Sequence, residues 1–329
     1  MKADALPLEL APVVLPARAI EPPTTISVEA RAALAVGATV PPKSRPALDD
    51  LEGWQRAKED SEAFWEPVAA QLLAGCRCRI ETQCIAGVTT YRCTPHESGN
   101  STRPLYLYFH GGAFVFGAGR FAMAFGAQAA DELGLTTLSV DYRTPPADPF
   151  PAALEDGFAV YRELLAEAGE RRIVVGGVSA GANLAAAVTL LVRERGLQPP
   201  AAVVLLTPEV DLTEAGDTFR TNALLDVTLK AGLAECNALY AAGHALTDPY
   251  VSPLFADFSA GFPPTLIQSG TRDLFLSNSV LMHRKLRSAG IEAELHVWEA
   301  MPHVGFGVAP VPENEEIGQE VRRFIARHC

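Results

Sequence analysis

Short apolar runs alternate with longer helical stretches along most of the chain, and this order constrains the fold more than any other feature. The apolar runs have the length of buried strands and lie at residues 105–109, 135–140, 173–176, 201–206, 264–268 and 292–298. The stretches between them have helical periodicity and lie at residues 121–133, 151–168, 180–195, 277–289 and 313–328. Strands that alternate with helices in this way make a parallel or mostly parallel sheet with helices on both faces.

Three stretches lie outside the alternation and predict additions to a central domain. Residues 1–50 are rich in Pro and Ala, so we expect an extended arm with one short helix. Residues 49–73 have a helical pattern, which Pro67 is expected to break into segments. The span 207–249, with a helical stretch at 229–242, predicts an insertion above the strand ends, where sheets of this class bind ligands.

The charge balance and the hydropathy pattern exclude several functional classes. Lys and Arg number 27 against 39 Asp and Glu, so the net charge is −12 and no nucleic-acid partner is expected. No apolar run reaches the length of about 18 residues that a membrane span needs. Pro7, Pro12 and Pro16 interrupt the N-terminal apolar stretch, which argues against a signal peptide. We therefore expect a cytoplasmic protein without a membrane span.

The six cysteines raise the question of a metal site or disulfides, because four of them lie within residues 76–93. Their spacing matches no common zinc pattern. Cys76, Cys78 and Cys84 share one face if the strand there is continuous. We expect small buried apolar side chains and no metal, with a disulfide or a metal site as the weaker alternatives. Reduced thiols agree with a cytoplasmic location.

One strand-to-helix junction carries a motif with chemical meaning. Residues 177–181 read Gly-Val-Ser-Ala-Gly, directly after the strand at 173–176 and before the helix at 180–195. In a nucleophile elbow the serine lies on a strained turn that exposes its hydroxyl, and the flanking glycines avoid clashes. The motif alone also fits a tight turn without chemistry. Its position between a strand and a helix favours Ser179 as a nucleophile, with the helix N-terminus near the developing oxyanion.

A second glycine-containing segment follows the strand at 105–109. It reads His110-Gly111-Gly112-Ala113-Phe114. Adjacent glycines let a loop lie close to a substrate and direct backbone N–H groups at one point. A flexible turn is the simpler alternative. A His-Gly-Gly run directly after a buried strand and upstream of an elbow is more specific, so we predict an oxyanion loop.

In combination, the two motifs resemble those of the hormone-sensitive-lipase-like (bacterial family IV) esterases of the α/β-hydrolase fold. Supporting runs lie at residues 141–143, 149–156, 209–213, 248–254 and 301–303. The resemblance covers about residues 50–328 and implies a mostly parallel central sheet of about eight strands, helices on both faces and a helical cap. It implies an N-terminal cap arm at 1–50 and a catalytic domain at 51–329, with residues 207–248 contributing to the cap.

The resemblance also implies roles for the residues of the two motifs. In that family the two glycines after the histidine and the residue after the nucleophile donate hydrogen bonds to the oxyanion. Those positions are Gly111, Gly112 and Ala180. The family usually has a third glycine where this chain has Ala113, and Asp or Thr where it has Val178. Neither residue is a catalytic group, so the departures concern pocket shape and subfamily placement.

A hydrolase of this kind needs an acid and a base, in the order Ser, Asp/Glu, His, on loops after later strands. Asp273 follows the strand at 264–268, and His303 follows the strand at 292–298. Both therefore lie at the same sheet edge as Ser179. Asp273 could also be a helix cap, and the family match favours it as the acid. His303 is the one histidine after the last strand with enough chain left for a helix.

Several neighbouring residues have expected supporting roles. His110 resembles the family's loop-bracing histidine rather than a second base. Phe114 and Phe116 are candidates for lining the substrate pocket, with core packing as an equal alternative. Ser277 occupies the place of a second acidic residue of the family and is expected to cap the helix at 277–289.

The sequence therefore predicts a serine carboxylesterase that hydrolyses short- to medium-chain esters of small molecules through an acyl-enzyme. Its triad would be Ser179, Asp273 and His303, and the mechanism requires no metal or organic cofactor. A lactonase or an esterase for a specialised natural product is an alternative within the same chemistry. A non-catalytic small-ligand receptor of the same fold is the alternative from another class, although such receptors characteristically lack a triad member. A homodimer is expected by analogy.

Overall fold

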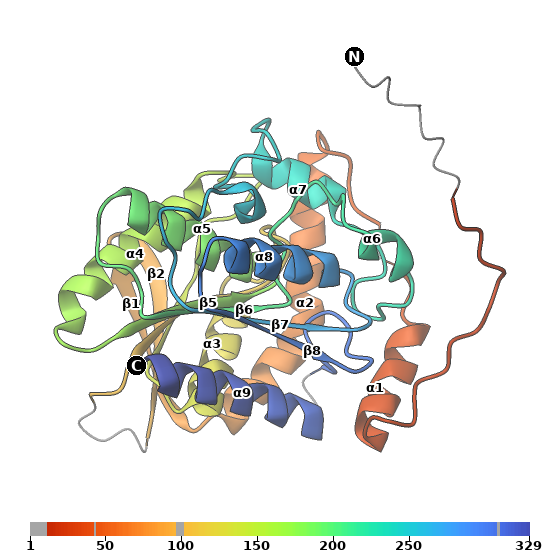
Figure 1. The fold of residues 1–329 in the computed structure, drawn as a ribbon, viewed down its shortest axis with the longest axis horizontal. Coiled ribbons are helices and arrows are strands. Elements are labelled where there is room, and N and C mark those ends of the chain that lie inside the picture. Colours follow the sequence, from red (N-terminus) through yellow and green to blue (C-terminus); the bar gives the residue numbers. More distant parts are fainter. Residues whose placement is uncertain (1–11, 43, 97–101, 308–309) are drawn as a thin grey trace, which may run out of the picture.

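The computed structural model describes residues 12–42, 44–96, 102–307 and 310–329, and one twisted sheet organises them (Figure 1). Eight strands lie in the order β1-β2-β4-β3-β5-β6-β7-β8. They are β1 (Cys78–Ile85), β2 (Val88–Pro95), β3 (Leu105–Phe109), β4 (Thr137–Val140), β5 (Ile173–Val178), β6 (Ala202–Leu206), β7 (Thr265–Gly270) and β8 (Ala293–Trp298). The pairs from β4 to β8 are parallel, and β2 pairs antiparallel with both β1 and β4. The predicted fold class is confirmed.

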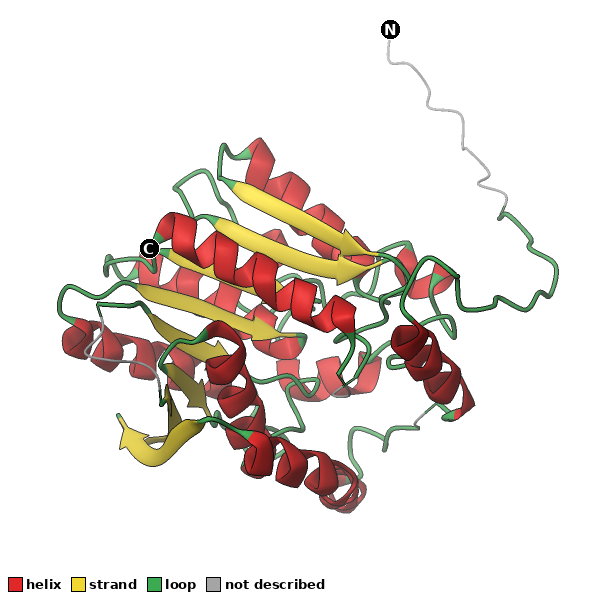
Figure 2. Cartoon of the chain, turned by 90° about the horizontal axis from the view of Figure 1, so that it is seen from below, coloured by secondary structure: helices red, strands yellow, loops and turns green. Residues whose placement is uncertain are grey.

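Helices cover both faces of this sheet. The helices of the described residues are α1 (Val28–Thr39), α2 (Leu51–Gly75), α3 (Arg120–Leu133), α4 (Ala152–Ala168), α5 (Ala180–Glu194), α6 (Thr218–Thr221), α7 (Ala234–Ala241), α8 (Leu276–Ser288) and α9 (Pro312–His328). In Figure 1 α4, α5 and α8 lie on one side of the sheet, and α3 and α9 lie on the other. Figure 2 shows α9, which ends at the C-terminus, lying roughly along the strands on its own face. Among the described residues, no helix is both long enough and apolar enough to span a lipid bilayer.

Strand β3 shows why the central strands are continuously apolar rather than alternating. Leu105, Leu107 and Phe109 enter the core cluster that packs beneath α4 and α5. Tyr106 and Tyr108 point to the opposite face and join the cluster that includes α9. All five side chains are buried. Successive side chains of a strand point to opposite faces of the sheet. Because helices cover both faces, all of these side chains are shielded from water, and every position favours an apolar or aromatic residue.

The short helix expected in the N-terminal arm is α1, and it packs on the central domain. Ser27 caps it by accepting a hydrogen bond from Ala30 N at 3.1 Å. The Ser27 hydroxyl also donates to Glu313 at the start of α9, at 2.8 Å. Ala30 and Leu34 are buried in a cluster with Met301, in the loop after β8. The arm therefore covers the loop that carries the predicted base.

Helix α2 corrects the expectation that Pro67 breaks the helical pattern, since the helix runs unbroken from Leu51 to Gly75. A proline inside a helix removes one backbone donor, and the remaining hydrogen bonds persist when packing holds both halves in line. Trp65 supplies that packing against α3, with ring centroids 5.5 Å from Phe121 and 6.2 Å from Phe125. Pro67 itself is exposed.

All six cysteines are free thiols, and they differ in burial. Cys78 and Cys93 are buried against α3, where burial raises the pKa of both thiols. Cys76 precedes β1, and its sulfur lies 3.6 Å from that of Cys78. The expectation of a buried side chain is wrong for Cys84, because β1 is an edge strand whose first residue alone is buried. It is also wrong for Cys329, which follows α9 and is exposed. Within the described ranges, no cluster of His, Cys, Asp and Glu could hold a metal ion.

The start of α5 lies unusually close to the end of β3. A Cβ atom on Gly181 would lie 2.1 Å from the carbonyl oxygen of Phe109 and 2.4 Å from that of His110. A Cβ atom on Gly177 would lie 2.5 Å from the backbone of Gly181. Contacts this short are forbidden, so only glycine permits the helix to follow β5 so tightly. This close approach sets the turn between β5 and α5.

We predict that Gly181→Ala lowers the free energy of unfolding by about 1–3 kcal/mol or more, because the new methyl group must push α5 away from β3. Urea denaturation followed by circular dichroism measures the loss. Gly75→Ala is the matched control, since its Cβ meets no atom within 4 Å. Equal losses in the two variants would show that the close approach is not the cause.

Replacing the exposed Pro67 by alanine should stabilise the protein, because it restores a donor inside α2 and removes the ring clash. We expect the free energy of unfolding to rise by about 1–3 kcal/mol. The exposed helical residue Gln71 provides the control: Gln71→Ala should change stability by less than about 0.5 kcal/mol. An unchanged or lower stability in Pro67→Ala would mean that α2 needs the bend that proline imposes.

Candidate active site

Ser179 lies at the turn between β5 and α5 in a strained backbone conformation. Its φ angle is +58°, a region that residues with side chains rarely adopt. The turn is held by Ser179 N, which donates to Leu206 O at 2.9 Å, and by Ala182 N, which donates to Ser179 O at 3.0 Å. Strain of this kind persists only where the surrounding structure enforces it, and it is common at active sites.

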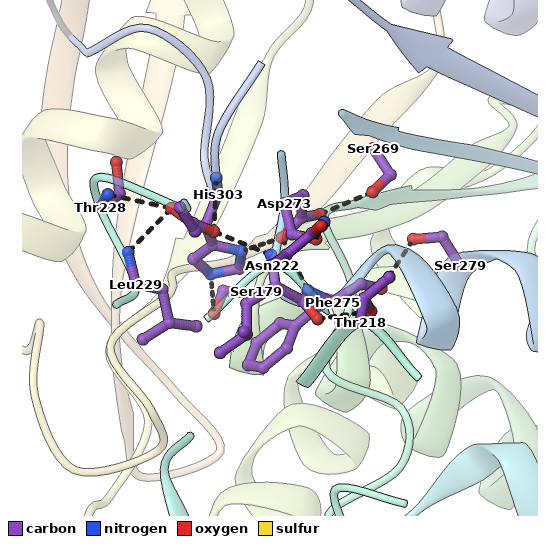
Figure 3. A network of polar contacts seen from close by, with 12 residues as sticks. Ser179, Thr218, Asn222, Thr228, Leu229, Ser269, Asp273, Phe275, Ser279 and His303 are labelled. Carbon is purple, nitrogen blue, oxygen red and sulfur yellow. Dashed lines mark hydrogen bonds and ion pairs between the residues drawn. The ribbon is translucent and has the colours of Figure 1, made fainter. Parts of the chain in front are cut away.

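A chain of hydrogen bonds joins the three residues predicted as the triad (Figure 3). The Ser179 hydroxyl oxygen lies 2.9 Å from His303 Nε2, and His303 Nδ1 lies 3.0 Å from Asp273 Oδ1. Asp273 is fully buried, and 5% of the surface of Ser179 and of His303 is exposed. Residues 94 and 124 positions away from Ser179 are thus brought to one sheet edge with the geometry of a nucleophile, a base and an orienting acid.

The acid candidate is held in place by its own turn after β7. Ser269 Oγ donates to Asp273 Oδ2 at 2.6 Å, and Phe275 N donates to Asp273 Oδ1 at 2.9 Å. The ring of Phe275 also meets the His303 imidazole edge-on, with centroids 4.7 Å apart. Asp273 Oδ1 therefore accepts from both Phe275 and His303, and the carboxylate has little freedom to turn. A fixed carboxylate selects the imidazole tautomer that leaves Nε2 free to accept a proton.

The predicted oxyanion loop lies directly against Ser179. An added Cβ on Gly111 would lie 3.4 Å from the Ser179 Cβ, and one on Gly112, at φ +125°, would lie 2.2 Å from Phe116 O. Within the described part of the chain, the backbone N–H groups of Gly111, Gly112 and Ala180 have no hydrogen-bond acceptor. Unpaired N–H groups beside a nucleophile are suited to stabilise a developing oxyanion.

His110 occupies the position of a structural brace beneath this loop. Its ring is fully buried, stacks on Tyr142 with centroids 4.1 Å apart, and contacts Gly111 O through Nδ1 at 2.8 Å. The Tyr142 hydroxyl donates to His110 O at 2.8 Å. Burial lowers the pKa of His110 to about 4. The imidazole is therefore neutral at neutral pH, and it has no contact with the Ser179 hydroxyl that a base would need.

The two phenylalanines considered as pocket residues differ in their surroundings. Phe114 is fully buried and stacks on Tyr240, near the end of α7, with centroids 4.0 Å apart. Phe116 is 8% exposed and lies 6.5 Å from the ring of Trp54. The guanidinium of Arg45 lies 4.9 Å above the Phe116 ring. Phe114 thus connects the oxyanion loop to α7, and Phe116 connects it to α2 and to the N-terminal arm.

The insertion between β6 and β7 is attached to the acid turn by several hydrogen bonds. Asn222 Nδ2 donates to Asp273 O at 2.8 Å and to Thr271 O at 3.2 Å. Thr218 and Ser277 exchange two hydrogen bonds, from Thr218 N to Ser277 Oγ and from Ser277 N to Thr218 Oγ1. The expectation that Ser277 caps its helix is wrong, because Phe275 is the N-cap of α8 and the Ser277 hydroxyl serves the insertion instead.

Two buried carboxyl groups near the triad were missed by the sequence analysis. Glu209 is fully buried, and neither carboxyl oxygen has a hydrogen-bond partner among the described residues. Burial raises the pKa of Glu209 well above its usual range. Asp226 is also fully buried, and its carboxylate accepts a hydrogen bond from His303 N at 3.1 Å. A lone acidic residue within an apolar run, Ala223–Val227, is the signal that could have revealed Asp226.

Comparison with known proteins agrees with this geometry. Residues 106–307 match the family model described as alpha/beta hydrolase fold. An acetyl-hydrolase of Streptomyces hygroscopicus is 34% identical over 222 residues, which covers 67% of this chain and 74% of that protein.

Solved structures show the same likeness over nearly the whole chain. Esterase E25 is similar with a TM-score of 0.86 and 31% identity, covering 96% of this chain and 99% of that one. A hormone-sensitive lipase from a metagenome library gives a TM-score of 0.79 and 29% identity, covering 92% and 99%. The expected family is therefore confirmed: the chain belongs to the alpha/beta hydrolase fold family, among its hormone-sensitive-lipase-like esterases.

Proposed function

We propose that the chain is a serine carboxylesterase in which Ser179 is the nucleophile, His303 the general base and Asp273 the orienting acid. The observation that carries this proposal is the unbroken chain of hydrogen bonds from the Ser179 hydroxyl through the His303 ring to the buried Asp273 carboxylate. A serine hydroxyl is a weak nucleophile at neutral pH and needs an adjacent base of this kind.

The reaction follows from the positions of these groups. His303 Nε2 takes the proton of Ser179 as its oxygen attacks the ester carbonyl, and Asp273 stabilises the imidazolium that forms. The N–H groups of Gly111, Gly112 and Ala180 receive the negative charge of the tetrahedral intermediate. His303 then protonates the leaving alcohol, which leaves an acyl-enzyme. Water repeats the steps and releases the acid, so the cycle uses only these side chains and the backbone.

The relatives support the substrate class. One is named an acetyl-hydrolase and others are named esterases, which favours small-molecule esters with short to medium acyl chains. We further propose that residues 1–50 and 207–248 form the cap over a catalytic domain at 51–329. The hydrogen bonds of the 207–248 segment to the acid turn support its place above the site. Cytoplasmic location and a homodimer stay predictions.

Two alternatives from the sequence analysis make different predictions in the same assay. A lactonase or an esterase for a specialised natural product would use the same three residues on a cyclic or larger ester. A hydrolase-fold receptor would bind a small ligand without turnover. The complete hydrogen-bonded set of serine, histidine and aspartate favours an enzyme over a non-catalytic receptor.

Hydrolysis of p-nitrophenyl esters from C2 to C12 tests the proposal directly. We expect turnover by the wild type with an optimum among the short or medium chains. Ser179→Ala should lower kcat/KM by roughly 10⁴–10⁶-fold, because the remaining groups cannot form an acyl-enzyme.

Ser259→Ala is the control for this assay, because Ser259 is exposed and bonds only to Asp257 among the described residues. It should retain wild-type kinetics. Equal activity in Ser179→Ala and Ser259→Ala would overturn the nucleophile assignment. A folded wild type without turnover on any chain length would favour the receptor or a narrow lactonase.

Acyl-length preference tests whether the oxyanion-loop aromatics also line the pocket. Phe114→Ala and Phe116→Ala remove a ring next to Gly111 and Gly112, so we expect the optimum to shift towards longer acyl chains. Phe258→Ala is a stability control, since Phe258 is equally buried but packs against Phe262. If the chain-length profile is the same in all three variants, the two rings serve core packing alone.

A further inference from the structure

We propose that Asp226 is a positioning residue that fixes the acid turn and the base loop of the triad relative to each other. The inference rests on the proposed serine esterase mechanism and adds a fourth side chain to it. Asp226 lies in the insertion between β6 and β7, far in sequence from both loops, and its side chain is fully buried.

The carboxylate of Asp226 accepts hydrogen bonds from four backbone N–H groups. Oδ2 receives Leu274 N at 2.8 Å and His303 N at 3.1 Å. Oδ1 receives Thr228 N and Leu229 N, both at 2.9 Å. Figure 3 shows Thr228 and Leu229 close to His303 of the triad. One oxygen atom thus joins the residue next to the acid and the base itself.

This arrangement couples the two distances on which the triad depends. Leu274 directly follows Asp273, so a shift of the acid turn moves a donor to Asp226 Oδ2. His303 N belongs to the base, so a shift of the base loop moves the other donor to the same atom. The loops also touch through Arg272 N, which donates to Met301 O at 3.2 Å. Asp226 lies closer to the reacting groups than this contact does. At such positions a displacement of about 1 Å can lower the rate on the order of 10²-fold.

Asp226 can serve as a reference point because its own segment is anchored. The bonds from Thr228 and Leu229 hold its carboxylate within a turn before α7, and that helix starts at Ala234 rather than at the expected residue 229. Asn222 binds the acid turn through Asp273 O, and Val227 packs against Gly37 of α1. The carboxylate therefore links the N-terminal arm, the insertion and the triad.

The charge of Asp226 is also felt by the base. Burial raises the pKa of Asp226 to about 6, while the interaction with His303 pulls it down and that with Asp273 pushes it up. These electrostatic interactions agree with the close placement of Asp226 beside both triad residues.

Kinetics of Asp226→Asn against Asp211→Asn test the proposal. The asparagine keeps the shape, but its NH₂ group cannot accept two of the four hydrogen bonds. We expect kcat for p-nitrophenyl acetate to fall about 10- to 100-fold, with KM changed less than about threefold. Asp211 is the matched control, a buried carboxylate of the same insertion whose side chain bonds, among the described residues, only to Thr213. Asp211→Asn should retain kcat.

A readout without substrate separates positioning from general destabilisation. The far-downfield proton resonance of the His303 Nδ1–H to Asp273 hydrogen bond should shift or broaden in Asp226→Asn and stay unchanged in Asp211→Asn. This measurement needs no turnover, so it tests the positioning role even if the wild type hydrolyses no ester. If Asp226→Asn does not fold, Asp226→Glu replaces it, because it keeps the carboxylate. Its kcat should still fall, by less than the factor expected for Asp226→Asn.

Support requires both a selective loss of kcat and a changed resonance. A folded Asp226→Asn with wild-type kcat would overturn the proposal. Equal loss in the Asp211 variant, or an unchanged resonance beside a reduced kcat, would also overturn it, because either result assigns the effect to something other than the triad geometry.

Discussion

The close approach of α5 to the end of β3 is the constraint on which the active site depends. Gly181 lies so near the Phe109 carbonyl that no side chain fits between them. The turn from β5 into α5 must therefore be sharp, and Ser179 takes a strained conformation at its apex. The same approach brings Gly111 beside Ser179, so one packing contact positions both Ser179 and the loop that faces it.

Parallel strands explain how distant residues reach this point. The carboxyl ends of β3, β5, β7 and β8 lie at one sheet edge, and each is followed by a loop that supplies part of the site. Sheet register alone does not fix the final placement of these loops. Side chains supply that placement: Tyr142 holds the loop after β3, Ser269 holds Asp273, and Asp226 spans the loops after β7 and β8.

Local signals predicted strands β3 to β8 and the motif residues, because apolar periodicity and glycine spacing act over a few residues. The supporting contacts escaped prediction because they join distant positions. Asp226 meets His303 across 77 residues, and Ser277 bonds to Thr218 instead of capping its own helix. The prediction of a helix break at Pro67 was wrong because a local signal was followed where distant contacts decide. The helix-breaking tendency of proline is outweighed by the packing of Trp65 on α3.

The hydrogen bonds between Ser27 and Glu313 have a consequence for the order of folding. They join positions separated by 286 residues, and α1 packs on the loop that carries His303. Contacts of such sequence separation form late, because closing a long loop costs entropy before the contact repays it. The central sheet and the nucleophile turn can assemble from neighbouring segments. We therefore expect the loop that carries His303 to be packed last, when α1 and α9 meet.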